Sequence, residues 1–532
     1  MGWKKKPESL ESTAVGSFLG LLRRHTGLAW FLAGLICCSW GPGGAQPPAW
    51  AAGGSVEAAT GSISAAELTQ IVSFLAHPDF EGREAGTPAA QKAAAWIREQ
   101  LAQLEIPPAG VESDYFQPFG DGFCNVLGIL PGDHPELAGQ VIVVGAHFDH
   151  IGFGRKREDG QVRPGADDNA TGVAAVLELA EAFRQFAPAC RRSLLFAFWD
   201  AEEKGLLGSK HWVNNPTVPF ESVVVALNFD MIGRLREDRL HLVGARSGIG
   251  WRRLFVLQNP GDLHLVFSWD IHPDSDHIPF FNAGIPSVMF HTGLHEDYHK
   301  PTDTADRIYY AGMERIVRYA FLVIYDLANR EEIPRYRPEA KKEKPPEWSA
   351  EIVPRLGVRC QATAENGRWV EIVEVLPGTP AEQAGIRAGD RVVRVDSREH
   401  PGWEDFVASV TAAEKELTLV VQPQAQGDPR EVTVSLAGPP MPFGLILGKD
   451  EADPEVAVVV GIIPASPAAL AGIRVGDRIW EVNGHLLGPD PLGRFPGLVK
   501  AERQANPHLS ILLTLEREGR IVRSALLEHS RN

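Results

Sequence analysis

Positive charge is scarce in this sequence of 532 residues. Lys and Arg total 52 against 68 Asp and Glu, so the formal net charge is -16. Proteins that wrap a phosphate backbone concentrate Lys and Arg on one face, so the balance argues against a nucleic-acid partner. With 44% hydrophobic and 23% charged residues, the composition is that of a globular chain, neither disordered nor embedded in a membrane. Its length suggests about three or four domains.

Cysteine is also scarce. Two of the five cysteines, Cys37 and Cys38, lie in the N-terminal segment, which leaves Cys124, Cys190 and Cys360 widely spaced in the remainder. Three such residues provide no CxxC metal motif and no disulfide framework, and they could form one bridge at most. We expect buried free thiols.

Long hydrophobic runs are absent, because the apolar stretch at residues 27–38 is shorter than the ~20 residues that span a bilayer. Basic residues precede this stretch, and small residues and prolines follow it. That order is typical of a signal peptide. We therefore expect residues 1–51 to be a signal peptide and leader, cleaved after Ala45 or Ala51, and the protein to be exported to the periplasm or the cell exterior.

The same segment is the one route to a membrane that the sequence offers. A lipid anchor on Cys37 or Cys38 is the alternative to cleavage, but Ile36 and Cys37 are poor substitutes for the small residue that normally precedes a lipidated cysteine. We expect membrane association only through the signal segment or such an anchor.

Residues 55–330 show alternating helical and strand-like patterns. Apolar spacing predicts two helices between Ser64 and Leu104, interrupted at 77–88, and a further helix at 171–186. Apolar runs at 141–145, 193–199, 222–229 and 286–290 predict strands. The alternation indicates an α/β domain with a mixed, largely parallel central sheet between layers of helices.

A charged, proline-rich stretch at residues 331–350 is typical of a linker. Beyond it the sequence repeats: PGTPAEQAGIRAGDR at 377–391 aligns with PASPAALAGIRVGDR at 464–478 at an offset of 87 residues. We therefore expect two copies of one small, β-rich domain, at 351–437 and 438–529.

Acidic and imidazole side chains recur just after the predicted strands. Parallel strands deliver such residues to one edge of the sheet. The clusters, in chain order, are His147 and Asp149; Asp167 and Asp168; Glu202 and Glu203; Asp230; and Tyr298, His299 and Asp303.

Each cluster taken singly has an ordinary explanation, such as a helix N-cap for Asp167 and Asp168 or a solvated helix start for the paired glutamates. Together they would bury uncompensated charge at a cost of several kcal/mol per group, which divalent cations would offset. Imidazole and carboxylate ligands suit zinc, with Mn²⁺ or Co²⁺ as substitutes. The donors outnumber the three protein ligands of a single catalytic zinc, so we expect two cations and one bridging carboxylate.

The ordered clusters, with FEGREAGT at residues 80–87, resemble the bacterial leucyl aminopeptidase and aminopeptidase Y family of co-catalytic zinc exopeptidases, which includes glutamate carboxypeptidase II and the transferrin receptor ectodomain. The resemblance implies the zinc exopeptidase fold. It also implies that Glu202 is the general base and that Tyr298 stabilises the tetrahedral intermediate. By the same resemblance, His147 and Asp230 bind one Zn²⁺, Glu203 and His299 bind the other, and Asp168 bridges both.

The repeated domains resemble PDZ domains, whose carboxylate-binding loop contains a glycine between apolar residues. Gly357 and Gly444 occupy such positions, also 87 residues apart. PDZ domains add a C-terminal peptide as an extra strand, so we expect a peptide ligand of this kind, with spacer domains that bind nothing as the alternative.

The sequence thus predicts an aminopeptidase that acts on peptide or protein substrates. A carboxypeptidase or dipeptidase shares the same metal core, and a PDZ scaffold with an inactive peptidase domain is the alternative outside the enzymes. Glutaminyl cyclases share the fold with one zinc, but the full set of five ligand residues favours two.

Overall fold

The computed structural model describes residues 55–154, 160–186, 190–345, 355–362, 370–423, 427–438, 440–464, 466–506 and 510–526. The predicted signal peptide and leader, residues 1–51, lie outside these ranges. Cys124, Cys190 and Cys360 are all free thiols, as expected, but only Cys190 is buried, and the other two are partly exposed.

None of the helices in the described ranges combines the length and the apolar character that a membrane span requires.

An eight-stranded mixed sheet forms the centre of the N-terminal region, in the order β1, β2, β4, β3, β5, β9, β6, β8. Parallel pairing joins β4, β3, β5 and β9 in the middle, whereas β2 joins β4 and β6 joins β9 in antiparallel pairs. The predicted mixed α/β sheet is confirmed. The strands are β1 (Phe116–Phe119), β2 (Phe123–Leu130), β3 (Val141–His147), β4 (Ser193–Trp199), β5 (Val223–Phe229), β6 (Arg239–Val243), β8 (His264–Phe267) and β9 (Ser287–His291).

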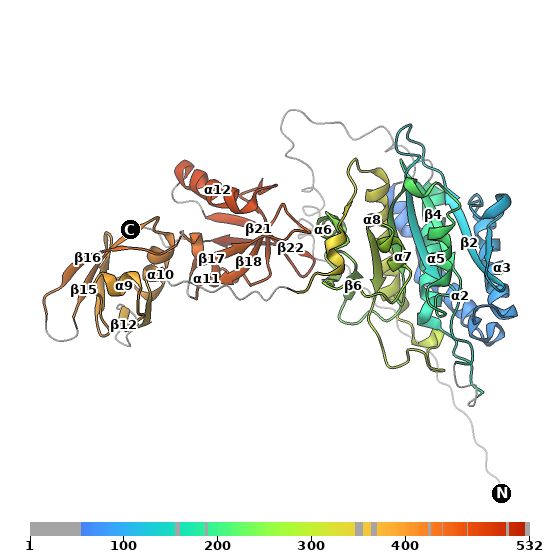
Figure 1. The fold of residues 1–532 in the computed structure, drawn as a ribbon, viewed down its shortest axis with the longest axis horizontal. Coiled ribbons are helices and arrows are strands. Elements are labelled where there is room, and N and C mark those ends of the chain that lie inside the picture. The colour runs from blue at the N-terminus through green and yellow to red at the C-terminus, as the bar shows by residue number, and fades with distance from the viewer. Residues whose placement is uncertain are drawn as a thin grey trace, which may run out of the picture. The chain divides into compact units, whose positions relative to one another are not determined.

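Helices cover both faces of this sheet (Figure 1). One face packs against α1 (Val56–Ser62), α2 (Ala65–Leu75), α3 (Pro88–Gln103), α4 (Gly172–Phe186), α6 (Trp251–Gln258) and α8 (Tyr310–Asn329). The other packs against α5 (Leu207–Asn214) and α7 (His277–Asn282). The predicted helices between Ser64 and Leu104 and at 171–186 are therefore confirmed as α2, α3 and α4.

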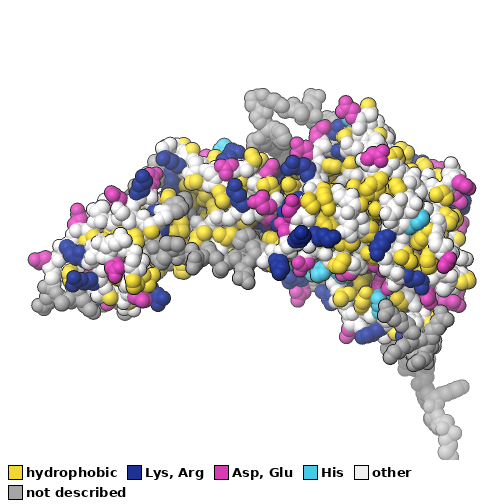
Figure 2. All heavy atoms as spheres, viewed as in Figure 1, with side chains coloured by type: hydrophobic (Ala, Val, Ile, Leu, Met, Phe, Trp, Pro, Cys, Tyr) yellow, Lys and Arg dark blue, Asp and Glu magenta, His cyan; other side chains and the backbone are white. Residues whose placement is uncertain are grey.

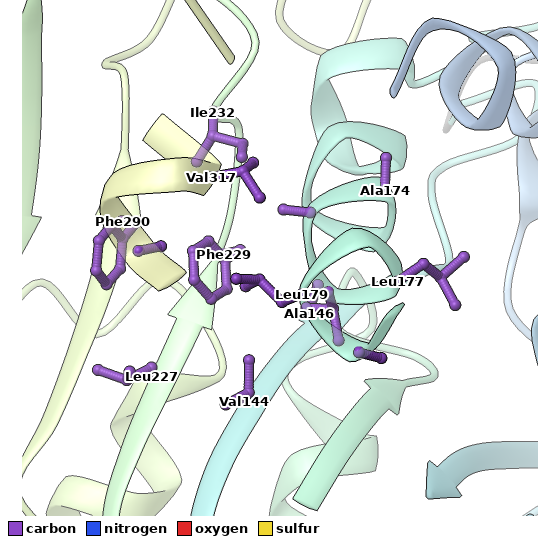
Figure 3. Close-up of a cluster of buried hydrophobic side chains, with 14 of the residues drawn as sticks. Val144, Ala146, Ala174, Leu177, Leu179, Leu227, Phe229, Ile232, Phe290 and Val317 are labelled. Atoms are coloured by element: carbon purple, nitrogen blue, oxygen red, sulfur yellow. The ribbon is translucent and has the colours of Figure 1, made fainter. Parts of the chain in front are cut away.

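The core is divided by the two-residue period of the strands. In β3, Ile142, Val144 and Ala146 belong to the larger cluster beneath α4, whereas Val141 and Val143 belong to the smaller one with α5 and α7. Figure 3 shows Leu179 of α4 close to Ala146 of β3 and Phe229 of β5, with Phe290 of β9 on the far side of Phe229. Because both faces are buried, these strands are apolar along their whole length, and polar residues are confined to their ends.

Local capping fixes where the first helices begin. The Ser64 hydroxyl accepts a hydrogen bond from the Glu67 amide at 3.2 Å, which caps the start of α2, and it donates to the Glu67 carboxylate at 2.7 Å. Thr87 caps α3, and Pro88 occupies its first turn, where a missing N–H costs nothing. In the break between α2 and α3, the first four residues of FEGREAGT, 80–83, belong to a 3₁₀ segment at Pro78–Arg83.

Two further sheets have the same topology. The first runs β11, β12, β13, β15, β16 and the second β17, β18, β19, β21, β22, with a short extra strand on β13 and β19. Their elements are β11 (Val358–Ala362), β12 (Val370–Val375), α9 (Pro380–Gln383), β13 (Arg391–Val395), β14 (Arg398–Glu399), α10 (Trp403–Ala412), β15 (Glu416–Gln422) and β16 (Arg430–Ser435); then β17 (Leu445–Gly448), β18 (Ala457–Ile462), α11 (Pro467–Leu470), β19 (Arg478–Val482), β20 (His485–Leu486), α12 (Pro491–Ala505), β21 (Ile511–Arg517) and β22 (Arg520–Leu526).

The 87-residue offset of the sequence repeat also separates equivalent strands of the two sheets. β11 and β17, β12 and β18, and β13 and β19 each begin 87 residues apart. Gly357 and Gly444 both have positive φ, and a Cβ on either would lie 2.1 Å from Thr379 or 2.3 Å from Ser466, which are themselves equivalent residues. Only glycine fits at these two positions.

The stretch predicted to be a linker includes ordered structure. Within it, β10 (Arg335–Tyr336) pairs with β7 (Gly248–Ile249), and the buried Arg337 donates to the main-chain oxygen of Arg246 at 3.0 Å. Residues 346–350 lie outside the described ranges. Charge and proline content therefore did not reveal that residues 331–345 contain a strand paired with β7 and a buried arginine.

Charges of both signs are interspersed over the face shown in Figure 2. Several exposed charges form ion pairs, such as Arg184 with Glu105 at 2.6 Å and Arg315 with Asp262 at 2.9 Å. Such surface pairs contribute about 0–1 kcal/mol each. The stability of the domain therefore rests on its apolar core.

Candidate metal centre

The parallel strands bring the predicted ligands to one edge of the sheet. β3 ends on His147, Glu202 and Glu203 follow β4, and Asp230 follows β5. Because these strands are neighbours and run in the same direction, their carboxyl ends open on the same side. The buried apolar strands thus fix the polar residues that follow them.

The first ligand group contains His147, Asp168 and Asp230, all of them buried. The Nε2 atom of His147 lies 3.5 Å from Asp168 Oδ1 and 3.5 Å from Asp230 Oδ1. Its Nδ1 atom lies 3.2 Å from the main-chain oxygen of Asp149, which directs Nε2 to the carboxylates. The other oxygen of Asp230 accepts a hydrogen bond from Ser275 at 2.6 Å.

The second group contains Asp168, Glu203, His299 and also His150. The Nε2 atom of His299 lies 3.0 Å from Asp168 Oδ2 and 3.2 Å from Glu203 Oε1. Asp168 therefore points one carboxylate oxygen at each group. That is the arrangement a carboxylate bridging two cations requires.

The donor atoms fit divalent cations. Zinc at 2.0–2.1 Å from each ligand in a tetrahedron places the ligand atoms about 3.3 Å apart, close to the separations within both groups. His299 Nε2 is buried and, although two carboxylate oxygens lie nearby, makes no properly directed hydrogen bond among the described residues. A nitrogen aimed between two oxygens is oriented as a ligand rather than as a hydrogen-bond donor.

Electrostatics show how strongly the groups depend on neighbouring charge. Burial disfavours the imidazolium, yet the neighbouring carboxylates of Asp168 and Glu203 raise the pKa of His299 to about 10. Burial also opposes ionisation of Glu203 and Asp230, but contacts with imidazoles hold the pKa of both carboxyls below its usual value. Cations would take over this compensation and release the protons, as metal binding to such ligands does.

The turn that carries Asp168 is held by a second carboxylate. Asp303 accepts hydrogen bonds from the amides of Asp167 at 3.0 Å and Asp168 at 3.2 Å. Asp167 points elsewhere, with Oδ1 accepting from the amide of Gly233 at 2.7 Å. Asp303 and Asp167 belong to neither ligand group, so their contribution is to position the turn.

Arg83, from FEGREAGT, joins the segments that carry the ligands. Its guanidinium is fully buried and donates at 2.8 Å to the main-chain oxygens of Leu75, Phe148, Pro164 and Gly165. Burial lowers its pKa to about 10, against the opposing effect of nearby carboxylates such as Asp168, so it stays charged near neutral pH. One side chain thus fixes the loop after β3 and the approach to Asp168.

Glu202 lies beside the first group without belonging to it. The Asp149 carboxylate accepts hydrogen bonds from the amides of Glu202 at 2.9 Å and Glu203 at 3.3 Å, which ties this turn to the end of β3. Burial raises the pKa of Glu202 well above its usual value, with His147 opposing the shift. A carboxylate with raised proton affinity, outside the ligand set, is suited to proton transfer.

Tyr298 is 37% exposed and stacks on the ring of His299, with 3.8 Å between ring centroids. Burial and the nearby carboxylates, Asp168 first among them, raise its pKa above the ordinary value. The hydroxyl therefore keeps its proton at neutral pH and can donate a hydrogen bond.

Sequence reasoning did not assign roles to His150 or Arg83. His150 stands three residues after His147 in the HFDH string, and Arg83 lies inside FEGREAGT, so the residue types were visible but their tertiary contacts were not. The Asp149 carboxylate lies 3.8 Å from His147 Nδ1, whereas the main-chain oxygen of Asp149 lies closer, so the main chain orients the imidazole.

The segment Ser275–His277 also reaches the site. Ser275 contacts Asp230, Asp276 accepts a hydrogen bond from Ser209, and the fully buried His277 has its pKa lowered to about 4 by burial. His277 is therefore neutral near pH 7, and it belongs to neither ligand group.

Leupeptin-inactivating enzyme 1 of Streptomyces exfoliatus is 31% identical over 192 residues, covering 34% of this chain and 38% of that protein. Aminopeptidase YwaD of Bacillus subtilis is 27% identical over 225 residues, covering 40% and 46%. This chain thus spans less than half of the length of these curated relatives. Among solved structures, the LapA aminopeptidase of Legionella pneumophila is 21% identical with a TM-score of 0.44, covering 52% of this chain and 75% of that one.

Family profiles match in the order that the structure shows. Residues 125–324, which include every member of the two ligand groups, match peptidase family M28, and residues 371–423 and 458–515 match the PDZ domain. The chain therefore contains a domain of peptidase family M28 followed by two PDZ domains.

Proposed function

We propose that this protein is an exopeptidase with two zinc ions, most specifically an aminopeptidase that hydrolyses the N-terminal peptide bond of peptides or proteins. The sharing of Asp168 between the two ligand groups is the observation that carries the proposal. One of the relatives is an aminopeptidase, and this relative and the M28 match support the same reaction class. Mn²⁺ or Co²⁺ would suit the same donors.

Some side chains of the site would bind the cations, and others would take part in the reaction with the substrate. His147 and Asp230 would hold one cation, Glu203 and His299 the other, and Asp168 both. When bound, the two cations supply a water of lowered pKa and polarise the scissile carbonyl. Glu202 accepts the proton of the attacking water and passes it to the leaving amine. Tyr298 donates a hydrogen bond to the developing oxyanion.

Amino-terminal specificity is supported by the charges near the ligands. A carboxypeptidase needs a cationic group to receive the substrate carboxylate. Among the described arginines near the ligands, Arg83 is held by four main-chain oxygens, and Arg234 and Arg307 both contact Asp297, at 2.5 and 3.7 Å. The carboxyl groups of Glu202 and Asp276 interact with His147, so acidic side chains that a free α-amino group needs are present near the ligands.

A panel of peptides tests this assignment. We expect release of the first residue from peptides with a free amino terminus, no release from their N-acetylated forms, and no release after the metals are stripped with a chelator. Release of the last residue from the acetylated forms would show a carboxypeptidase instead. Two bound metals with no hydrolysis of either series would contradict the enzymatic proposal, and no bound metal would favour the inactive PDZ scaffold.

A second function, peptide binding, is proposed for the PDZ domains. A pocket beside β11 is lined by Gly357 and Val358 and by the apolar side chains of Trp403 and Phe406, which belong to α10. A peptide added to the edge of β11 would place its last side chain there. Peptides with a free C-terminal carboxylate should bind the protein, and the same peptides amidated should not; equal binding of both would favour spacer domains.

Export is proposed from the N-terminal sequence. The mature protein isolated from its natural source should begin after Ala45 or Ala51 and be recovered from the periplasm or the medium. An intact N-terminus in the cytoplasmic fraction would contradict this. Lipid attached to Cys37 or Cys38 would show the anchored alternative.

A further inference from the structure

His150 approaches the same two carboxylates as His299. Its side chain is fully buried, and its Nδ1 atom lies 2.9 Å from Glu203 Oε1 and 3.5 Å from Asp168 Oδ2. Those two oxygens are also the ones near His299 Nε2, at 3.2 and 3.0 Å. Two imidazole nitrogens and two carboxylate oxygens therefore converge from four residues, and all four atoms lie within 4.8 Å of one another.

We propose that His150 is a fourth protein ligand, through Nδ1, of the cation held by Asp168, Glu203 and His299. The inference rests on the proposed two-metal function and deepens it. Closed zinc sites have four protein ligands, whereas catalytic zinc sites have three and an open position. The His150 side of the centre is then closed, and the open position belongs to the side of His147 and Asp230, next to Glu202.

The surrounding chain is shaped to hold the His150 ring in this place. A Cβ on Gly165 would lie 2.6 Å from the ring, so a glycine there leaves the room that the imidazole occupies. Arg83 fixes that glycine by donating to its main-chain oxygen at 2.8 Å, and the Arg83 oxygen accepts from the His150 amide at 3.2 Å. The ring also meets His299 edge to face, with 5.5 Å between centroids.

The competing explanation is that His150 only donates a hydrogen bond to Glu203 and so positions that ligand. The two explanations differ in what a glutamine would do at this position. A glutamine amide can donate to Glu203, but it cannot replace an imidazole nitrogen as a ligand. His150→Gln therefore separates them, and His150→Ala removes both interactions.

Cobalt titration of the metal-free full-length protein provides a readout that does not depend on activity. Four-coordinate Co²⁺ absorbs visible light much more strongly than five- or six-coordinate Co²⁺. We expect the first equivalent to enter the closed site with an intense four-coordinate band and the second to add a weaker one. In His150→Gln and His150→Ala the intense band should be lost, and affinity for the first equivalent should fall by about 10–100-fold or more.

His295→Ala is the matched control, because His295 is a nearby histidine whose Nε2 lies 3.1 Å from Asp167, outside both groups. It should keep two equivalents and the intense band. Thermal unfolding of the metal-free variants identifies any that fail to fold. Unchanged band intensity and affinity in a folded His150→Gln protein would overturn the assignment of His150 while leaving the proposed function intact. Failure of the wild type to bind two equivalents would overturn both.

Discussion

The two ligand groups are built at the same edge of the sheet from one shared aspartate, yet they differ in composition and exposure. The group of His147 and Asp230 has three members and is buried throughout, whereas the group of Glu203, His299 and His150 has four and includes the partly exposed His299. The group with fewer donors is the one that faces the ionisable Glu202. The number of donors and the distance from the proposed base therefore distinguish the two sides of the site. The four-membered group binds its cation with more protein ligands, and the three-membered group lies beside the base that takes part in the reaction.

Removing the shared residue should abolish this difference altogether. Asp168→Ala deletes a donor from both groups, so we expect both cations to be lost. Peptidase activity should fall by about 10³-fold or more, since bound metals stabilise the transition state by several kcal/mol. Metal content by elemental analysis and turnover check this. Asp167→Ala, its neighbour in the same turn, should retain both metals; a doubly loaded Asp168→Ala protein would refute the bridging role.

Removing the proposed base should abolish proton transfer without affecting metal binding. Glu202→Gln should lower kcat by about 10²–10⁴-fold, the usual contribution of proton transfer, and leave two metals bound. Glu203→Gln, one residue along, should instead lose metal from the four-membered group. Parallel assays of turnover and metal content distinguish the two variants. Normal turnover in Glu202→Gln would show that another group accepts the proton.

The hydroxyl of Tyr298 should matter less than the base. Tyr298→Phe keeps the ring stacked on His299 but removes a donor to the oxyanion, and one such donor contributes about 10²–10³-fold in kcat. We expect a fall near the lower end, because the side chain is partly exposed, with KM and metal content little changed. A change in KM alone would indicate substrate binding instead.

Glu178 shows how burial changes the pKa of a carboxylate that belongs to neither ligand group. Burial, with smaller contributions from neighbouring glutamates, raises its pKa from 4.5 to about 8, although its carboxylate accepts a hydrogen bond from the Ser64 amide. The folded pKa lies above the unfolded one, so this group costs stability progressively as the pH rises from 4.5 to 8.

Glu178→Gln should therefore melt at a higher temperature than the wild type at pH 8 and at the same temperature below pH 4.5. The rise should be of the order of 2–4 °C, as about 1 kcal/mol gives in a domain of this size. Calorimetry at both pH values measures it, with the exposed Glu57→Gln as control. A difference that persists at low pH would point to packing rather than charge.

The sequence was sufficient for the parts of the fold that carry a strong local pattern. The buried strands β3, β4, β5 and β9 are continuous apolar runs, so they and the residues that follow them were predictable. β1, β6 and β8 were not, because these short strands lie toward the margins of the sheet and alternate between buried and exposed positions. The repeat predicted both PDZ sheets, since an offset in sequence needs no tertiary information.

The site was predictable where ligands follow strands and hidden where contacts join distant segments. His147, Glu203 and Asp230 could be collected from strand ends, and the resemblance supplied their partners. Arg83 and His150 could not be assigned, because their roles depend on main-chain oxygens and carboxylates that lie up to 82 residues away in sequence. Likewise, nothing local in residues 331–345 indicates that Arg337 is buried.

Anomalous X-ray diffraction from crystals grown with zinc tests the central claim most directly. For the proposed two-metal centre, we expect two zinc peaks per chain, one beside His147 and Asp230 and the other beside Glu203 and His299, with Asp168 between them. A single peak, or zinc bound away from Asp168, would contradict it.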